Sequence, residues 1–212
     1  MANSNEQERV WGGVLLGGKS SRMGQPKHLI KQDGVTWLEL AAAKLAFKVE
    51  QVALSGAGEL PSALASLPRV PDAPGLAGPL AGIVALLRWQ PTVSWLVMAC
   101  DLPDVQPEAL SWLLAQRRPD RLAVLPQLDE DGPLEPLLAW YDSRCLPLLE
   151  KLAASGPPSL NRLAGQTGIC VVQPPVHLRR SWRNVNTPDE LRRSSLSLYR
   201  RPEPNASVRR PK

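Results

Sequence analysis

Three cationic side chains stand close together in a glycine-rich segment near the start of the chain. Lys19, Arg22 and Lys27 lie within nine residues and directly follow the glycine pair Gly17 and Gly18. Glycine lets a backbone approach a ligand closely, and the free N–H groups of such a loop can bind phosphate oxygens. Cationic side chains beside the loop add charge-assisted contacts. The segment therefore predicts a phosphate-binding site, with solvated surface cations as the alternative.

A carboxylate follows the most apolar run of the chain. Residues 94–99 read Ser-Trp-Leu-Val-Met-Ala and end at Cys100 and Asp101, a pattern typical of a buried central strand. Ligands of open α/β sheets bind outside the carboxyl ends of the strands, and Mg2+ is typically held by one or two carboxylates together with phosphates. Asp101 is therefore the candidate metal ligand, and a helix cap or loop carboxylate is the other interpretation.

The glycine-rich segment also satisfies a literal P-loop pattern. Residues 13–20, Gly-Val-Leu-Leu-Gly-Gly-Lys-Ser, match G-x-x-x-x-G-K-[ST] and would make Lys19 the phosphate-binding lysine. In a true P-loop the four variable residues form the loop, whereas Val14, Leu15 and Leu16 belong to the predicted strand. Because a buried strand cannot also wrap phosphates, a P-loop ATPase or kinase is the less favoured hypothesis.

Strand-like and helix-like segments alternate along the chain. Solid apolar runs bounded by turn residues predict strands, and apolar spacing of three and four residues predicts helices. Strands are expected at 10–16, 51–54, 94–99, 121–125, 134–140 and 169–173, and helices at 35–48, 76–89, 107–117, 144–154 and from Thr187. The fourth and fifth strands should form a hairpin-like excursion. The alternation predicts a Rossmann-like, open, mostly parallel α/β sheet with helices on both faces.

Length and charge limit the class of protein. The chain has 212 residues, 43% of them hydrophobic, which fits a single domain at 10–192 with a flexible N-terminus at 1–9 and a basic, disordered tail at 193–212. Residues 192–212 hold seven basic side chains and one acid, a net +6 against +5 for the whole chain, which leaves −1 for the rest. The basic character therefore belongs to the tail, and nucleic-acid binding by the domain is not expected.

Cysteine and histidine usage excludes other classes. The three cysteines are widely spaced, which argues against a disulfide framework and a zinc site. The first residues are polar and no run of 18 apolar residues occurs, so we expect no signal peptide, no membrane segment and a cytoplasmic location. The two histidines, His28 and His177, give no Ser-His-Asp constellation.

Five segments in order resemble the molybdenum cofactor guanylyltransferase family. They are residues 15–27 (LLGGKSSRMGQPK), Asp72 followed by 78–83 (GPLAGI), 97–103 (VMACDLP), 135–141 (EPLLAWY) and 184–191 (NVNTPDEL). The likeness covers about residues 10–192. Leu16 departs from the alanine that is usual in the first segment, and Ser55 departs from an asparagine often found at its position.

The resemblance implies a nucleotidyltransferase with a fold like that of the nucleotide-diphospho-sugar transferases. It would transfer GMP from Mg-GTP to the terminal phosphate of molybdopterin and release pyrophosphate, with Mg2+ as cofactor. Lys27 resembles the family's triphosphate-contacting lysine, supported by Arg22, with Asp101 as the metal ligand. The implied nucleotide-binding residues are Leu15, Leu16, Gly17, Gly18, Lys27, Ser55, Asp72 and Asp101, and the implied acceptor-side residues are Asn184 and Asn186.

Other functions stay open at this point. Within the same class, the chain could be a cytidylyltransferase for the same acceptor or a sugar-phosphate nucleotidyltransferase, because guanine and the pterin come from the resemblance alone. In another class, it would be a non-catalytic cofactor-delivery partner of molybdoenzymes or their chaperones. Asn184 and Asn186 are equally consistent with an asparagine-rich turn before a helix.

Overall fold

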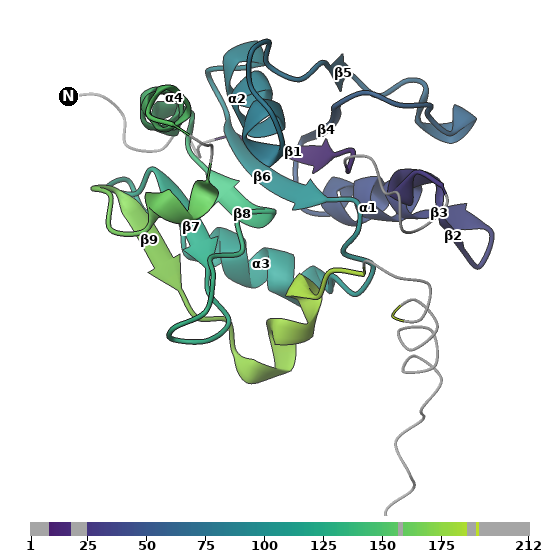
Figure 1. Ribbon diagram of the computed structural model, residues 1–212. Helices are drawn as coiled ribbons and strands as arrows, with labels where there is room; N and C mark the ends of the chain where they lie inside the picture. Colours follow the sequence, from purple (N-terminus) through teal and green to yellow (C-terminus); the bar gives the residue numbers. More distant parts are fainter. Residues whose placement is uncertain (1–8, 18–24, 157–158, 186–189, 191–212) are drawn as a thin grey trace, which may run out of the picture.

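The computed structural model describes residues 9–17, 25–156, 159–185 and 190 of the chain. Its centre is a seven-stranded sheet (Figure 1). From one edge to the other the strands are β5 (Arg69–Val70), β4 (Gln51–Ser55), β1 (Val10–Leu15), β6 (Ser94–Ala99), β8 (Leu138–Tyr141), β7 (Ala123–Pro126) and β9 (Ile169–Val172). β8 is antiparallel to its neighbours β6 and β7, and the other pairings are parallel. The expected mostly parallel sheet with a hairpin-like excursion is confirmed.

Helices cover both faces of this sheet. They are α1 (Trp37–Ala46), α2 (Pro79–Trp89), α3 (Pro107–Ala115) and α4 (Leu146–Ala154). α1 and α3 contribute to one apolar core and α2 and α4 to the other, and Figure 1 shows the two pairs on opposite sides of the strands. The four central strands β1, β6, β7 and β8 are buried along their whole length, as expected for a sheet covered on both faces.

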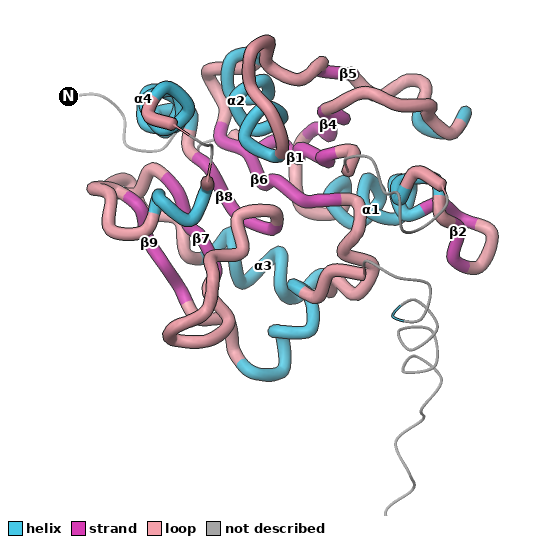
Figure 2. Tube along the Cα trace, viewed as in Figure 1, coloured by secondary structure: helices cyan, strands magenta, loops and turns pink. Residues whose placement is uncertain are grey.

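Short elements complete the chain. They are the 3-10 helices η1 (Lys27–Leu29), η2 (Ser62–Leu64), η3 (Ser143–Cys145), η4 (Leu160–Leu163) and η5 (Val176–Trp182). The strands β2 (Lys31–Gln32) and β3 (Val35–Thr36) form a separate two-stranded sheet. Figure 2 shows η5 as a cyan turn after β9, and η5 contacts α3. These elements have too few residues for a periodic pattern, which is why the sequence did not predict them.

Several element boundaries differ from the prediction for local reasons. The helix expected from residue 35 begins at Trp37, because Val35 and Thr36 pair with β2 and Thr36 then forms a capping box with Glu39. The helix expected from 76 begins at Pro79, after Gly78 adopts a φ of 66°. The strand expected at 134–140 is regular only in β8, since Leu134 makes an isolated bridge outside it.

Close packing of α2 on the sheet depends on a glycine. A Cβ atom placed at Gly13 of β1 would overlap the side chain of Leu86 of α2, so the buried Leu86 side chain occupies the space above this glycine. The three cysteines are free. Among the described residues, no helix is long and apolar enough to cross a membrane. The expected N-terminal segment, the basic tail and the helix start at Thr187 lie outside the described residues.

Candidate functional site

The first predicted site residues meet where three parallel strands end. Leu15 is in register with Ser55 of β4 and with Ala99 of β6. Beyond the strands, Leu16 N–H donates to the Ser55 carbonyl at 2.8 Å, and Gly17 N–H donates to the Sγ of Cys100 at 3.4 Å. Gly17, which follows β1, and the Cys100-Asp101 turn after β6 therefore lie side by side at the carboxyl edge of the sheet, where α/β proteins bind ligands.

Lys27 and Asp101 form the central contact of this edge. Lys27 Nζ lies 2.7 Å from Asp101 Oδ2, and the two side chains are only 13% and 16% exposed. Because both charged groups are largely withdrawn from water, their attraction is screened less than that of a surface pair. The structure thus brings together the predicted triphosphate lysine and the predicted metal ligand.

His28, which the sequence did not single out for the site, anchors Lys27. Its ring is 3% exposed, and its Nε2 lies 3.0 Å from the carbonyl oxygen of Glu59. A carbonyl only accepts hydrogen bonds, so Nε2 carries the proton in this contact. Burial lowers the pKa of His28 below 6.5, which favours the neutral form of the ring. The signal in the sequence was its position beside Lys27 in a polar segment.

Three predicted nucleoside contacts converge on Gly82 in α2. A Cβ atom at Gly82 would lie 2.9 Å from Leu15 Cδ2, 3.1 Å from Ser55 Oγ and 3.5 Å from Asp72 Oδ1. Ser55 is buried, and its hydroxyl donates to the Gly82 carbonyl at 3.3 Å. The Asp72 residue is exposed to solvent. Neighbouring atoms still remove part of the water around its carboxyl group, which raises the pKa of that group. The packing leaves space for these groups only because residue 82 has no side chain.

The segment before Asn184 is tied to the Asp101 turn. Val185 N–H donates to the Asp101 carbonyl at 3.1 Å. The Asp104 carboxylate, with its side chain 2% exposed, lies 2.8 Å from Arg183 Nη2 and 3.4 Å from Arg180 Nη2. These contacts hold Asn184, whose side chain is exposed, at the same edge as Asp101. The sequence missed Asp104 because its arginine partners are distant along the chain.

A cavity of about 530 Å³ opens beside this segment. Its lining comes from the start of α2, the approach to β8, the start of η4 and the segment after η5, and consists of residues 77–80, 134–137, 159–161 and Asn184. The Leu137 carbonyl accepts from Ala99 N–H at 2.8 Å, so the approach to β8 lies directly against the end of β6. Its volume is within the usual range for small-molecule sites.

The donor set at the edge fits a metal ion that arrives with a nucleotide. In the part of the chain that the structure describes, no cluster of three or more His, Cys, Asp or Glu side chains could hold a metal ion. Asp101 presents a carboxylate beside the glycine turn. Mg2+ characteristically takes one or two carboxylates and completes its shell with phosphate oxygens and water. Asp101 would hold it in that way.

The structure also bears on the literal P-loop pattern. Val14 and Leu15 lie in β1, and Val14, Leu15 and Leu16 are all buried. Residues of a buried strand cannot wrap a phosphate, so the structural objection to the P-loop hypothesis is confirmed. Lys19 and Gly18, like Arg22 and Asn186, lie outside the described residues, and their roles stay predictions.

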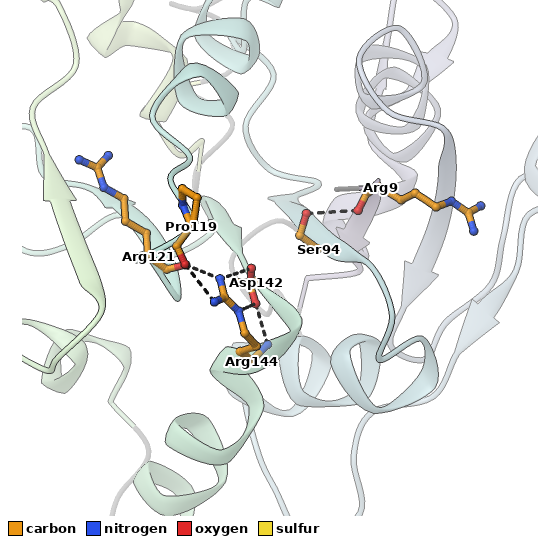
Figure 3. A network of polar contacts seen from close by, with 6 residues as sticks. All are labelled: Arg9, Ser94, Pro119, Arg121, Asp142 and Arg144. Carbon is orange, nitrogen blue, oxygen red and sulfur yellow. Dashed lines mark hydrogen bonds and ion pairs between the residues drawn. The ribbon is translucent and has the colours of Figure 1, made fainter. Parts of the chain in front are cut away.

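A second polar network has a different role. Arg144 donates from Nε and Nη2 to the two oxygens of Asp142 at 2.6 and 2.9 Å, and from Nη1 to the Pro119 carbonyl at 2.9 Å (Figure 3). Asp142 follows the carboxyl end of β8, which is antiparallel to β6 and so points to the opposite edge of the sheet. This network joins the end of β8 to the loop before β7 and does not belong to the candidate site.

Known proteins resemble this chain in sequence. Residues 12–168 match the family model described as the MobA-like NTP transferase domain. A probable molybdenum cofactor guanylyltransferase of Bacillus cereus is 30% identical over 188 residues, which cover 85% of this chain and 93% of the relative. A Bacillus anthracis protein with the same name is 32% identical over 184 residues, with coverages of 84% and 91%. A molybdenum cofactor biosynthesis bifunctional protein of Synechocystis is 35% identical over 147 residues, 68% of this chain and 42% of that longer protein.

Solved structures share the fold. The molybdopterin-guanine dinucleotide biosynthesis protein A of Archaeoglobus fulgidus superposes with a TM-score of 0.71 at 27% identity, covering 89% of this chain and 98% of that chain. The 4-diphosphocytidyl-2C-methyl-D-erythritol synthase of Anaerococcus prevotii, only 13% identical, superposes with a TM-score of 0.63 and coverages of 91% and 97%, a likeness of fold alone. The predicted fold class is confirmed by these neighbours.

Proposed function

This chain belongs to the MobA-like NTP transferase family, and from that premise we propose that it transfers GMP from Mg-GTP to the terminal phosphate of molybdopterin. The chain is a nucleotidyltransferase, and its relatives at about 30% identity are named for molybdenum cofactor guanylyl transfer. The observation that supports the proposed reaction most directly is the Lys27–Asp101 pair, 2.7 Å long, beside the glycine turn of β1.

The reaction is an in-line displacement at the α-phosphorus of GTP. An oxygen of the acceptor phosphate forms the new P–O bond, the bond between the α-phosphorus and the bridging oxygen breaks, and pyrophosphate leaves with that oxygen. Such a reaction needs two anions held in line and their charge neutralised, so positioning and electrostatics supply most of the rate. The acceptor phosphate is already anionic, which removes the need for a strong general base.

The site residues have separate roles in this proposal. Lys27 contacts the triphosphate oxygens, with Arg22 in support, and Asp101 holds the Mg2+. The metal, when bound, neutralises phosphate charge as pyrophosphate leaves. On the nucleoside side, Leu15, Leu16, Gly17, Gly18, Ser55 and Asp72 contact the base and ribose. On the acceptor side, Asn184 and Asn186 line the approach of the pterin phosphate.

Transfer can be measured directly with the purified full chain. Incubation with Mg-GTP and molybdopterin is expected to release pyrophosphate and form the guanine dinucleotide. Parallel incubations replace GTP with CTP, and molybdopterin with a sugar phosphate plus UTP. Product with CTP in place of GTP would assign a cytidylyltransferase, and product on the sugar phosphate a different acceptor. The proposal is contradicted if neither pyrophosphate nor dinucleotide is detected with GTP or with CTP.

The same assay separates catalysis from cofactor delivery. The Asp101→Asn variant is expected to lose transfer, whereas a protein that only carries the cofactor to molybdoenzymes or their chaperones would keep its function in this variant. We propose a cytoplasmic location, because unpaired cysteines such as Cys100, Cys145 and Cys170 are typical of a reducing compartment. The proposed substrates are GTP and molybdopterin, and no role for nucleic acid or a membrane is proposed.

A further inference from the structure

A half-buried carboxylate in the cavity beside α2 has no partner in the described chain. Glu135 lines the cavity, and its backbone N–H donates to the Pro126 carbonyl at 2.7 Å, which holds the residue in place. Within the described ranges, no side chain or backbone group makes a hydrogen bond or ion pair with the Glu135 carboxylate. Charged groups withdrawn from water are normally paired, so this carboxylate is suited to a partner that comes from outside the chain.

The walls around Glu135 favour a flat, donor-bearing ligand. The apolar side chains among the lining residues are Ala77, Pro79, Leu80, Leu134, Pro136, Leu137 and Leu160. Burial in these surroundings raises the pKa of the Glu135 carboxyl above its ordinary value, because the apolar walls disfavour the charged form. A ligand that donates two hydrogen bonds to the carboxylate would reverse that penalty, and hydrogen bonds to ionised acceptors are among the strong ones.

We propose that Glu135 is a specificity-determining residue that reads the 2-amino-4-oxopyrimidine edge of the acceptor's pterin ring. On that edge a ring N–H and the exocyclic amino group point the same way, so both can donate to the two oxygens of one carboxylate. This inference rests on the proposed function, because it takes the acceptor to be a pterin. It adds a recognising group to the acceptor side beyond Asn184.

Guanine presents the same pair of donors, so the position of Glu135 decides between the two rings. The groups expected at the nucleoside, Leu15, Ser55 and Asp72, converge on Gly82 of α2. Glu135 lines instead, together with Asn184, the cavity that also borders the first residues of α2. That placement puts Glu135 on the acceptor side of the site and assigns the pterin to it.

Two simple pteridines test the inference. Pterin and lumazine differ at this edge of the ring: position 2 carries an amino group in pterin and a carbonyl in lumazine, which also has a hydrogen on N1. Both are fluorescent. We expect the wild-type chain to prefer pterin by about tenfold, the usual size of a lost hydrogen bond to a charged group. Glu135→Gln should reduce this preference to less than about threefold and leave the affinity for Mg-GTP unchanged.

A matched control and a folding measurement accompany the variant. Glu130→Gln makes the same chemical change on an exposed residue of the neighbouring loop and should keep the wild-type preference for pterin. Glu135→Gln preserves side-chain volume, and its melting temperature is compared with that of the wild type. A wild-type chain that does not prefer pterin to lumazine, or a Glu135→Gln variant with the wild-type preference, overturns the inference.

Measurements on the wild type separate this inference from the proposed function. If the wild type transfers no GMP to molybdopterin, the proposed function is wrong. If transfer occurs and the pteridine preference is the same in Glu135→Gln, only the role of Glu135 is wrong. If Glu135→Gln weakens GTP binding while pterin binding is unchanged, the carboxylate reads guanine and the assignment to the pterin is overturned.

Discussion

Lys27 Nζ and Asp101 Oδ2 lie 2.7 Å apart although 74 residues separate them in the chain. The pair forms because η1, which begins at Lys27, and the turn after β6 both lie at the carboxyl edge of the sheet. Each side chain therefore balances the charge of the other. In the proposed reaction Lys27 contacts the anionic triphosphate and Asp101 contacts the cationic metal. Substrate binding therefore replaces this ion pair with two contacts that again join opposite charges.

Replacing Lys27 tests whether it is the triphosphate lysine. We expect Lys27→Ala to lower kcat/KM for GTP by roughly 10²-fold, the usual cost of removing one group that stabilises developing charge. Lys19→Ala should have a mild effect, because Val14 and Leu15 belong to the buried strand β1 and not to a P-loop. Steady-state pyrophosphate release measures both. The reverse ranking of the two variants would favour the P-loop hypothesis.

Asp101→Asn tests the metal ligand. The substitution keeps the size of the side chain and removes the negative charge that Mg2+ requires. We expect Mn2+ to bind in the presence of GTP at least about tenfold more weakly, measured by electron paramagnetic resonance, and transfer to be lost. Asp131→Asn, on an exposed residue, serves as the matched control. Wild-type Mn2+ affinity in Asp101→Asn would show that the ligand lies elsewhere.

Asp104 should stabilise the fold more than a surface ion pair does. Asp104→Asn is expected to lower the free energy of unfolding by about 1–2 kcal/mol, less than for a fully buried pair because Arg180 and Arg183 are 38% and 47% exposed. Glu150→Gln breaks the exposed pair with Arg88 and should cost no more than about 0.5 kcal/mol. Urea denaturation compares the two variants. Equal costs would mean that burial of Asp104 contributes nothing.

His28 should make stability depend on pH. Burial lowers the pKa of His28 in the folded chain below 6.5, so below pH 6.5 the unfolded chain binds more protons than the folded one. The free energy of unfolding should therefore fall as the pH decreases from 6.5 toward the folded pKa, and this contribution is fully present above 6.5. In His28→Gln the decrease should be smaller, as measured by urea denaturation above and below pH 6.5. The same decrease in both proteins would mean that His28 is not the titrating group.

The sequence determined those features that depend on neighbouring residues. Residues 94–99 form a buried strand, as their apolar run predicts, and β1 ends at Leu15, two residues before Gly17. Hydrophobic periodicity and turn residues act over a few positions, so they identify elements, their type and a mostly parallel sheet. Asp101 could be selected because it directly follows such a strand, and Lys27 because it lies beside the glycine loop.

Only the tertiary structure decided which distant residues meet. It placed β1 between β4 and β6, which brings Lys27 to Asp101, and it buried His28 against Glu59. It also joined Asp104 to two arginines of the segment before Asn184, and it placed Glu135, which has no partner among the residues that the structure describes, in a cavity with Asn184. These relationships arise from strand order and from helices packing across the sheet, which bring together side chains 30 to 80 positions apart. The spacing of apolar and turn residues within one segment does not indicate contacts between residues so far apart in the sequence. The free energy that selects these partners comes from burial of the whole core.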